Sequence, residues 1–225
     1  ENRDRAMLSM SRVEAIPFES MKAGMLWDWI TFPEWLDTLE RIPKGVNVLS
    51  YVPVGPLMIW VMGLEAAKTR SATEAEVKEM CRLLELSLDA GGCGWSVQRL
   101  GDGFMSLQRD YDGTPMVTDC MDDDLCLAFA EVLKKRGSKG HIQITQASDD
   151  IRGDMKFVEK LAEVSGCPVL YNAILANEYY PKQHRRLVDW VNQCQDRGNQ
   201  VWGQLLTTGN DFSFTFEDFN LLDGQ

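Results

Sequence analysis

Strand-like and helix-like segments alternate along most of this chain. Apolar, β-branched runs centred near residues 49, 95, 143, 170 and 203 are separated by segments with helical periodicity. Such alternation predicts an α/β fold with parallel strands and right-handed crossovers. Two architectures satisfy it, an open doubly wound sheet and part of a (β/α)8 barrel. The sequence has no dinucleotide-binding or P-loop glycine motif.

The expected elements have recognisable boundaries. The first strand covers residues 46–52, and the next helix begins at a capping box, Thr73 to Glu76, and ends before Gly91. Later strands are expected at 93–97, 141–146, 168–172 and 200–206, and later helices at 122–136, 154–164 and 182–197. The polar stretch 99–118 is too long for a bare connection, so we expect it to be functional or mobile.

Residues 1–45 precede the first strand. They contain a helical start at 2–10 and a second capping box, Thr31 to Glu34. Between these lies Trp27-Asp28-Trp29, which we interpret as a packed loop covering an end of the sheet. We therefore divide the chain into 1–45, a helical lead-in with an active-site-covering loop, and 46–225, a series of central βα units.

The charge and the cysteines exclude several classes of protein. The net charge is −11, and no basic cluster is larger than residues 134–136, which argues against a nucleic-acid or anionic-membrane partner. No apolar run is long enough to span a bilayer, and the charged first residues do not read as a signal peptide. The 6 cysteines have no pattern of close pairs, which indicates reduced thiols and a cytoplasmic location.

Several long and unusual segments resemble a known family. They are residues 13–17, 24–37 (GMLWDWITFPEWLD), 46–63 with its Val-Pro-x-Gly-Pro-Leu, 72–76, 89–96 (DAGGCGWS) with Arg99 after it, and 165–169. Together they are similar to the N-acyl-D-amino-acid deacylase (D-aminoacylase-like) branch of the amidohydrolase superfamily.

This resemblance implies a zinc-class metal-dependent hydrolase on a TIM-like (β/α)8 barrel, in which a metal-activated water cleaves a linear amide. The chain would supply about five βα units, and segments or a chain not seen here would complete the barrel. The family's essential His-x-His and last-strand Asp have no counterpart in this sequence, which is expected to start after the first and stop before the second. The divalent metal is thus expected to be held by residues outside this chain.

Departures from the family pattern accompany the matches. Val54 stands where relatives carry the histidine of Val-Pro-His-Gly, and Gln146 and Ala173 stand where relatives end two strands in Thr-His and Ser-His. An amide oxygen is a poor zinc ligand beside imidazole, thiolate or carboxylate. Either the metal is bound by other ligands in this subgroup, or this chain has lost part of the metal site.

Polar side chains are expected at the carboxyl ends of the strands, where barrel enzymes place their sites. We take the substrate-binding residues to be Ser96, Arg99, Gln146, Asn172 and Gln204, because amides can bind a carbonyl and arginine can grip a carboxylate. Several of them could instead satisfy buried backbone groups. Gln143 and Gln146 cannot share a face, since they are three apart on a strand, and Gln146 is favoured as nearer the carboxyl end.

The remaining titratable candidates have simpler explanations. The sequence holds only 2 histidines, and we interpret His141 as a structural or surface residue and His184 as part of a solvated helix face. The acids at 149–150 and 122–124 are typical of a first helical turn, although Asp149 or Asp150 could be a ligand or base.

The sequence thus predicts a hydrolase of a linear amide or related C–N bond, such as an N-acyl amino acid. Its partners would be a small-molecule amide and a companion polypeptide or oligomer. The alternative is a non-catalytic or degenerate amidohydrolase-like subunit that binds a partner chain. That subunit would need its two open sheet edges covered.

Overall fold

A single parallel sheet forms the centre of the molecule. The computed structural model describes residues 2–101, 108–176 and 180–205. Their strands are β1 (Val52–Pro53), β2 (Gly94–Arg99), β3 (His141–Gln146), β4 (Val169–Ile174) and β5 (Val201–Leu205), and every neighbouring pair is parallel. The predicted α/β class is confirmed.

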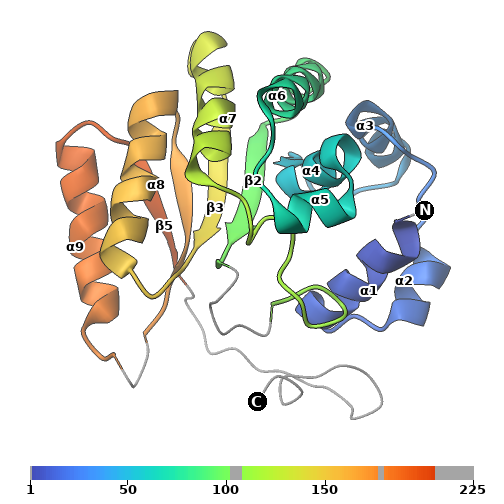
Figure 1. Ribbon diagram of the computed structural model, residues 1–225, viewed down its shortest axis with the longest axis horizontal. Helices are drawn as coiled ribbons and strands as arrows, with labels where there is room; N and C mark the ends of the chain where they lie inside the picture. Colours follow the sequence, from blue (N-terminus) through green and yellow to red (C-terminus); the bar gives the residue numbers. More distant parts are fainter. Residues whose placement is uncertain (1, 102–107, 177–179, 206–225) are drawn as a thin grey trace.

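The order of the strands decides between the two architectures left open by the sequence. The sheet runs β1-β2-β3-β4-β5, so strands that follow one another in the chain are always neighbours. A doubly wound sheet reverses its strand order at one point, and this sheet does not. Right-handed crossovers in one direction place all connecting helices on the same face. Figure 1 shows α7, α8 and α9 together in front of the strands, as in an arc of a (β/α)8 barrel.

The connecting helices begin and end near their predicted positions. They are α6 (Glu74–Asp89), α7 (Asp123–Lys135), α8 (Ile151–Ser165) and α9 (Gln183–Asp196). The predicted capping box of α6 is present, because Thr73 accepts from the Glu76 amide while the Glu76 carboxylate accepts from the Thr73 amide. Asp122 caps α7 in the same manner by accepting from the Leu125 amide. None of the helices in the described ranges is long and apolar enough to cross a lipid bilayer.

The hydrophobic core lies between the sheet and these four helices. Alternate residues of β2, β3 and β4 point into it, and Trp95, Ile142 and Ile144 are wholly buried. Trp95 meets Phe129 of α7 edge-on, with ring centroids 6.0 Å apart. At the other end of the sheet, Tyr171 and Trp190 of α9 make a similar contact at 5.5 Å. The opposite face of the sheet, which we call the open face, has none of these helices packed on it.

The first strand is much shorter than the sequence predicts. Only Val52 and Pro53 pair with β2, although the Ser50 carbonyl also accepts from the Cys93 amide. Residues 40–49 are all exposed. A β-branched run becomes a strand only where a neighbour supplies hydrogen bonds, and the described residues place no strand on the outer side of this segment.

Two helices that the sequence pattern did not predict follow β1. They are α4 (Val54–Met62) and α5 (Leu64–Thr69). Pro56 obscured α4, but it lies in the first turn, where a missing N–H costs nothing. Gly63, with φ of 82°, ends α4 and turns the chain into α5.

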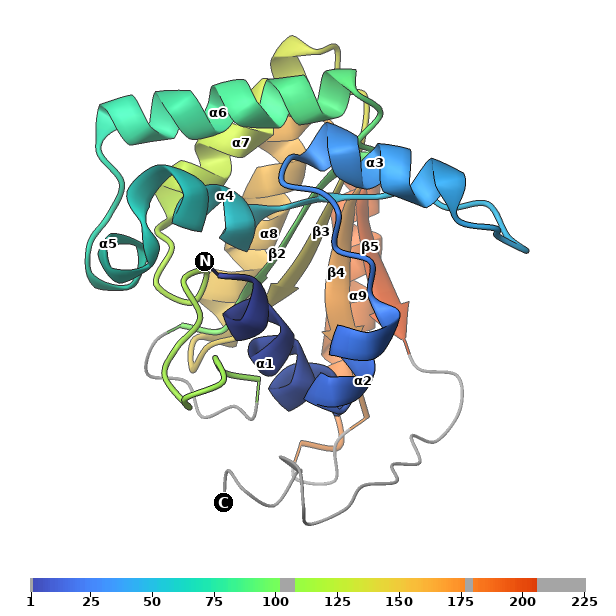
Figure 2. The same ribbon diagram turned by 90° about the vertical axis from the view of Figure 1, so that its right-hand side faces the viewer.

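Three helices precede the sheet. They are α1 (Arg3–Glu14), α2 (Phe18–Gly24) and α3 (Phe32–Arg41), and α3 begins at the predicted capping box of Thr31 and Glu34. Figure 2 shows α1 and α2 at the level of the strand arrowheads and α3 at the opposite level. The N-terminal segment thus runs along the β1 side of the sheet from one end to the other.

Removing the α6 cap should cost a modest, measurable amount of stability. We expect Thr73→Ala to lower the free energy of unfolding by about 1 kcal/mol, because the variant loses the acceptor for the Glu76 amide. Urea denaturation followed by circular dichroism measures it. Ser71→Ala, two residues earlier at an exposed site, is the control. Equal unfolding midpoints for the two variants would contradict the cap's contribution.

Candidate functional site

Polar side chains form two rows across the open face of the sheet. The register aligns Ser96, Gln143, Leu170 and Trp202 in one row. The second row lies nearer the carboxyl ends of the strands and consists of Gln98, Thr145, Asn172 and Gln204. Since residues two apart on a strand share a face, both rows point away from α7, α8 and α9.

Hydrogen bonds within the second row are few. Asn172 donates from Nδ2 to Thr145 Oγ1 at 3.1 Å, and Gln98 donates to the Gln108 carbonyl at 3.4 Å. Gln204 is exposed and makes no side-chain hydrogen bond to the described part of the chain. The row therefore keeps free amide donors and acceptors at the end of the sheet where barrel enzymes bind substrate.

Arg99 does not lie with the other predicted substrate-binding residues. Its side chain is on the helix side of β2 and is only 8% exposed. Nη2 donates to the Met121 carbonyl at 3.0 Å and to Asp123 Oδ1 at 2.7 Å, and the guanidinium lies 4.7 Å from the centre of the Phe157 ring. In this position Arg99 joins β2 to α7 and α8 and is separated by the sheet from Ser96, Asn172 and Gln204.

Gln146 is also on the helix side. Its Nε2 donates to Asp154 Oδ1 of α8 at 2.7 Å, and the same carboxylate accepts from the Ser148 amide at 2.8 Å. The expectation that Gln146 rather than Gln143 faces the open side is corrected by the register, which puts Gln143 beside Ser96. Gln146 follows the buried residues Ile142 and Ile144 at spacings of two, so its side chain points to the same face as theirs. Nearness to the carboxyl end of the strand did not predict that face.

The histidines and cysteines are dispersed. His141 is exposed at the amino end of β3, and His184 lies in the first turn of α9. None of the 6 cysteines, all of which lie in the described ranges, forms a disulfide. Burial raises the pKa of the Cys126 thiol to about 12, so this thiol is protonated at neutral pH.

The described residues do not fit a catalytic zinc ion. They contain no group of three or more histidine, cysteine, aspartate or glutamate side chains that could hold a metal. The open face offers amides, hydroxyls, a leucine and a tryptophan instead. Zinc in proteins prefers imidazole, thiolate and carboxylate ligands, and the two rows contain none of these. Their amides and hydroxyls are suited to hydrogen bonding instead.

The long segment after β2 is fastened by a buried carboxylate. Asp119 accepts from the Leu100 amide at 2.9 Å, from Arg109 Nη1 at 2.8 Å and from the Met116 amide at 2.9 Å. Residues 100–101 and 108–121 are thus tied together at the carboxyl ends of the strands. The expectation of a functional or mobile loop extends over residues 102–107, which lie outside the described ranges.

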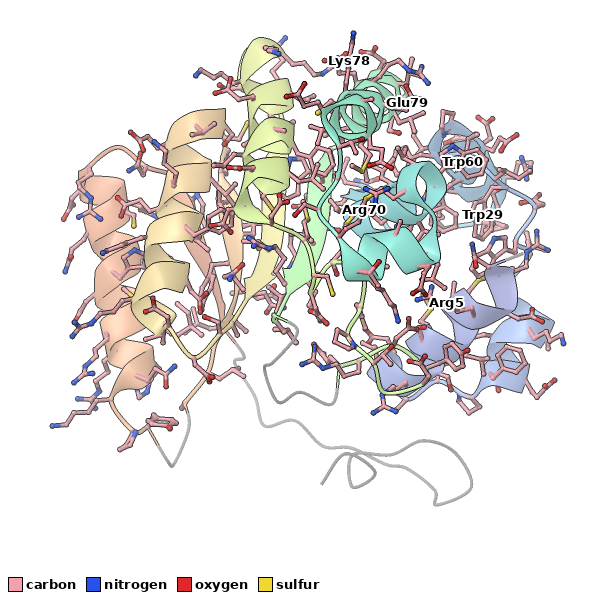
Figure 3. The ribbon with its side chains drawn as sticks, in the orientation of Figure 1. Arg5, Trp29, Trp60, Arg70, Lys78 and Glu79 are labelled. Atoms are coloured by element: carbon pink, nitrogen blue, oxygen red, sulfur yellow. The ribbon has the colours of Figure 1, made fainter. Side chains whose placement is uncertain are left out.

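A second buried carboxylate ties α1 to the same segment. Asp110 is 1% exposed and accepts from Arg5 and Ser9 of α1 and from Lys68 of α5, whose Nζ lies 2.7 Å from Oδ2. Figure 3 labels Arg5 at this junction. Burial raises the pKa of the Asp110 carboxyl, but hydrogen bonds from Lys68, Ser9, the Tyr111 amide and Arg5 outweigh it and leave the pKa below its ordinary value of 3.8.

This shift makes the attachment of α1 sensitive to acid. A carboxyl with a depressed pKa in the folded state stabilises the fold above its unfolded pKa and stops doing so as the pH falls through the folded value. We expect the unfolding free energy of the wild type to fall more steeply between about pH 5 and pH 3 than that of Asp110→Asn. Urea denaturation across that range measures both slopes, and parallel curves would contradict the assignment.

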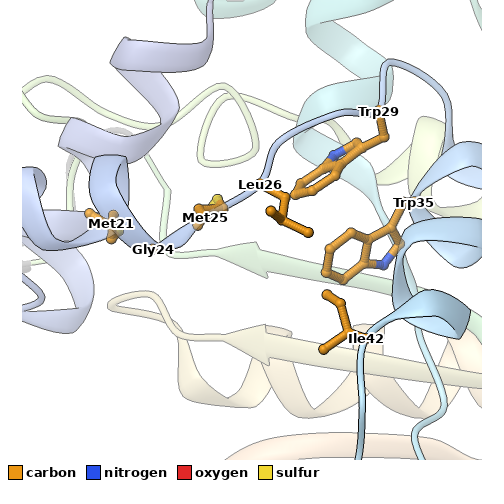
Figure 4. A pocket seen from close by; sticks show the side chains of 7 residues that line it. All are labelled: Met21, Gly24, Met25, Leu26, Trp29, Trp35 and Ile42. Atoms are coloured by element: carbon orange, nitrogen blue, oxygen red, sulfur yellow. The ribbon is translucent and has the colours of Figure 1, made fainter.

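An apolar cavity lies between α2 and α3. It has a volume of about 320 Å³ and is lined by Met21, Gly24, Met25, Leu26, Trp29, Trp35 and Ile42 (Figure 4). Trp29 stacks on Trp27 with ring centroids 5.5 Å apart, and Trp35 donates from Nε1 to Ser50 Oγ at 3.0 Å. The aromatic segment is thus packed against α3, while Leu26 at its edge is 65% exposed.

Comparison with known proteins identifies the fold. The D-aminoacylase whose binuclear metal centre has been described superposes on 76% of this chain with a TM-score of 0.59 and 16% identity. The N-acyl-D-glutamate deacylase from Bordetella bronchiseptica, solved with zinc and a phosphonate inhibitor, superposes on 76% with a TM-score of 0.52 and 15% identity. The chain has the same fold as part of these two structures. It spans about a third of each of these structures, 32% and 33% respectively.

Sequence comparison finds longer relatives. Uncharacterized proteins of Mycobacterium bovis and Mycobacterium tuberculosis are 38% identical to this chain over 100 residues. The matched part is 42% of this chain and 16% of each relative, so the match spans about a sixth of their length. No protein-family profile matches the sequence. The structural comparison therefore establishes the fold of this chain, and neither comparison establishes its activity.

Proposed function

We propose that this chain forms part of the substrate-facing wall of a metal-dependent hydrolase that cleaves a linear amide or related C–N bond. The observation that carries the proposal is the row of Gln98, Thr145, Asn172 and Gln204 at the carboxyl ends of four adjacent barrel strands. The fold shared with D-aminoacylase and N-acyl-D-glutamate deacylase supports the reaction class, and N-acyl amino acids or similar amides are the proposed substrates.

In this proposal the zinc or other divalent ion is held by residues outside this chain. The donor set of the open face supports that division, because amides and hydroxyls bind substrate carbonyls well and zinc poorly. This chain's part is to bind and orient the amide. The proposed setting of the enzyme is cytoplasmic, which is supported by the 6 cysteines because none of them forms a disulfide in the described structure.

The partner proposed is a companion polypeptide or oligomer that covers the two sheet edges. At the β1 edge, Val46 and Leu49 are 75% and 77% exposed, and at the β5 edge Trp202 is 50% exposed. Unpaired strand edges flanked by apolar side chains pair readily with another chain. Within the described ranges no further strand pairs with β1 or β5, and these two edges are the proposed sites for completing the barrel.

The test compares the chain alone with its complex. Tagged chain is purified by itself and from its native source, and both samples are analysed for bound metal and for hydrolysis of N-acetyl-D-amino acids. We expect the chain alone to bind no stoichiometric zinc and to be inactive. A copurifying polypeptide with a His-x-His motif should bring both the metal and chelator-sensitive activity. Tightly bound zinc in the isolated chain would contradict the ligand placement.

A non-catalytic, partner-binding subunit is the second candidate. The absence of a metal-binding group among the described residues favours it. This candidate predicts a stable complex that lacks hydrolytic activity even after zinc is added. The metal and activity measurements on the complex therefore separate the two functions.

A further inference from the structure

The two rows of the open face carry no charge. Their members are Ser96, Gln143, Leu170 and Trp202 in the first row and Gln98, Thr145, Asn172 and Gln204 in the second. Arg99 is the only cation among the predicted substrate-binding residues. It lies on the other side of the sheet, where it donates hydrogen bonds to the Met121 carbonyl and to Asp123. A ligand on this face therefore meets neutral hydrogen-bonding groups.

Charge decides which part of a substrate such a surface can take. A carboxylate that leaves water needs a cation or an array of strong donors, and without one its desolvation is unfavourable. Side-chain amides present donors and acceptors together, so their natural complement is a group that also has both. A carboxamide or peptide-type amide meets this requirement, and a carboxylate has acceptors only.

Several of these side chains are free to bind. The side chains of Ser96, Gln143 and Gln204 make no hydrogen bond within the described part of the chain. Asn172 uses Nδ2 to donate to Thr145, which leaves its Oδ1 as an acceptor. The face thus retains at least one free acceptor and several free donors near the carboxyl ends of β3, β4 and β5.

An apolar wall adjoins the amides. Trp202 precedes Gln204 by two residues on the same face of β5 and is 50% exposed, and Leu170 is its register partner on β4. An aromatic ring beside free amides suits a ligand with one apolar and one hydrogen-bonding side. A short apolar substituent next to an amide has that shape.

We infer that the open face binds an uncharged amide group of the substrate, with its apolar substituent against Trp202 and Leu170, and that the substrate's carboxylate is not bound here. The inference rests on the proposed function, since it names the part of the amide substrate that this wall recognises. It differs from the sequence expectation, which paired the amides with Arg99 as a carboxylate clamp.

A matched pair of small ligands tests the inference on the intact chain. N-acetyl-D-leucinamide and N-acetyl-D-leucine differ only in the terminal group, and each is titrated into 15N-labelled protein. We expect both ligands to shift the side-chain NH₂ signals of Gln143, Asn172 and Gln204 and the indole signal of Trp202, because both carry the N-acetyl amide, and we expect the carboxylate to give the acid no advantage in Kd beyond about threefold. Binding of the acid more than about threefold tighter than that of the amide, shifts located elsewhere, or no binding of either ligand would overturn the inference.

Variants sharpen the result. Gln204→Glu places a carboxylate in the second row with almost no change in shape, so we expect it to weaken amide binding several-fold. Gln193→Glu makes the same change at an exposed position of α9 and should leave binding unchanged. Arg99→Lys should leave the affinity for the acid unchanged, and a loss of acid binding in that variant would show that Arg99 holds the carboxylate after all.

The result of this titration can be told apart from the result of the activity test of the proposed function. The titration measures binding without turnover. It can fail while a completed complex hydrolyses amides, and it can succeed while the complex proves inactive. Agreement of both measurements would assign amide recognition to this chain and catalysis to the assembled barrel.

Discussion

Gly94→Ala should disrupt the sheet at its centre and cost about 3–5 kcal/mol of stability. Gly94 begins β2 with φ of +146°, and a Cβ built there would lie 1.8 Å from the His141 carbonyl oxygen and 2.8 Å from the His141 nitrogen. These are backbone atoms of β3, and the His141 amide is held by the Cys93 carbonyl at 2.9 Å. The neighbouring strand cannot move aside without losing that pairing.

The matched control is Gly45→Ala. Gly45 is exposed, and nothing lies within 4 Å of the Cβ that the substitution adds. Urea denaturation should show the control close to wild type, within about 0.5 kcal/mol. If Gly94→Ala were as stable as Gly45→Ala, the close approach of β2 and β3 would be wrong.

Asp119→Asn should have a comparably large effect, about 3–5 kcal/mol. The Asp119 side chain is fully buried, and the substitution leaves Arg109 without its carboxylate inside the protein. It also removes one of the acceptors that hold the Leu100 and Met116 amides. The loss should be greatest for residues 108–121, which this carboxylate ties to the carboxyl end of β2.

Hydrogen exchange locates that loss as well as measuring it. Amides in 108–121 should exchange faster in Asp119→Asn than in wild type, by more than those of α9. Glu131→Gln is the control, because Glu131 pairs with Lys134 at 3.2 Å on the surface and such pairs contribute less than about 1 kcal/mol. Uniform exchange across the molecule would argue against a local anchoring role.

Much of the fold could be predicted because its signals are local. The capping boxes at Thr31 and Thr73 involve residues three apart, and the alternation of strands and helices depends on periodicity within short windows. The strand order was not predictable in this manner. It required the pairing of segments that lie 27 to 47 residues apart, and that pairing decided between a barrel arc and a doubly wound sheet.

The candidate site was predicted less well, for two physical reasons. Successive side chains of a strand point to opposite faces of the sheet, so an error of one residue exchanges the two faces. Arg99 and Gln146, which pair with each other, lie one residue beyond Gln98 and Thr145 of the open face and therefore point to the helix side. Buried carboxylate anchors depend on distant partners, as in the contact of Asp110 with Arg5 over 105 positions. The sequence marked residues 99–118 as more than a connection but could not show what held them.

The unbroken order of the strands also bears on how the molecule reaches its structure. Each strand pairs with the one made just before it, so the residues paired in the sheet lie 27 to 47 positions apart in the chain. Parallel pairing over such separations forms slowly compared with helices, but the βα units can still pack in turn as the chain leaves the ribosome from its N-terminus. At every stage of synthesis the newest strand is the free edge, and the next βα unit to emerge is the piece that covers it.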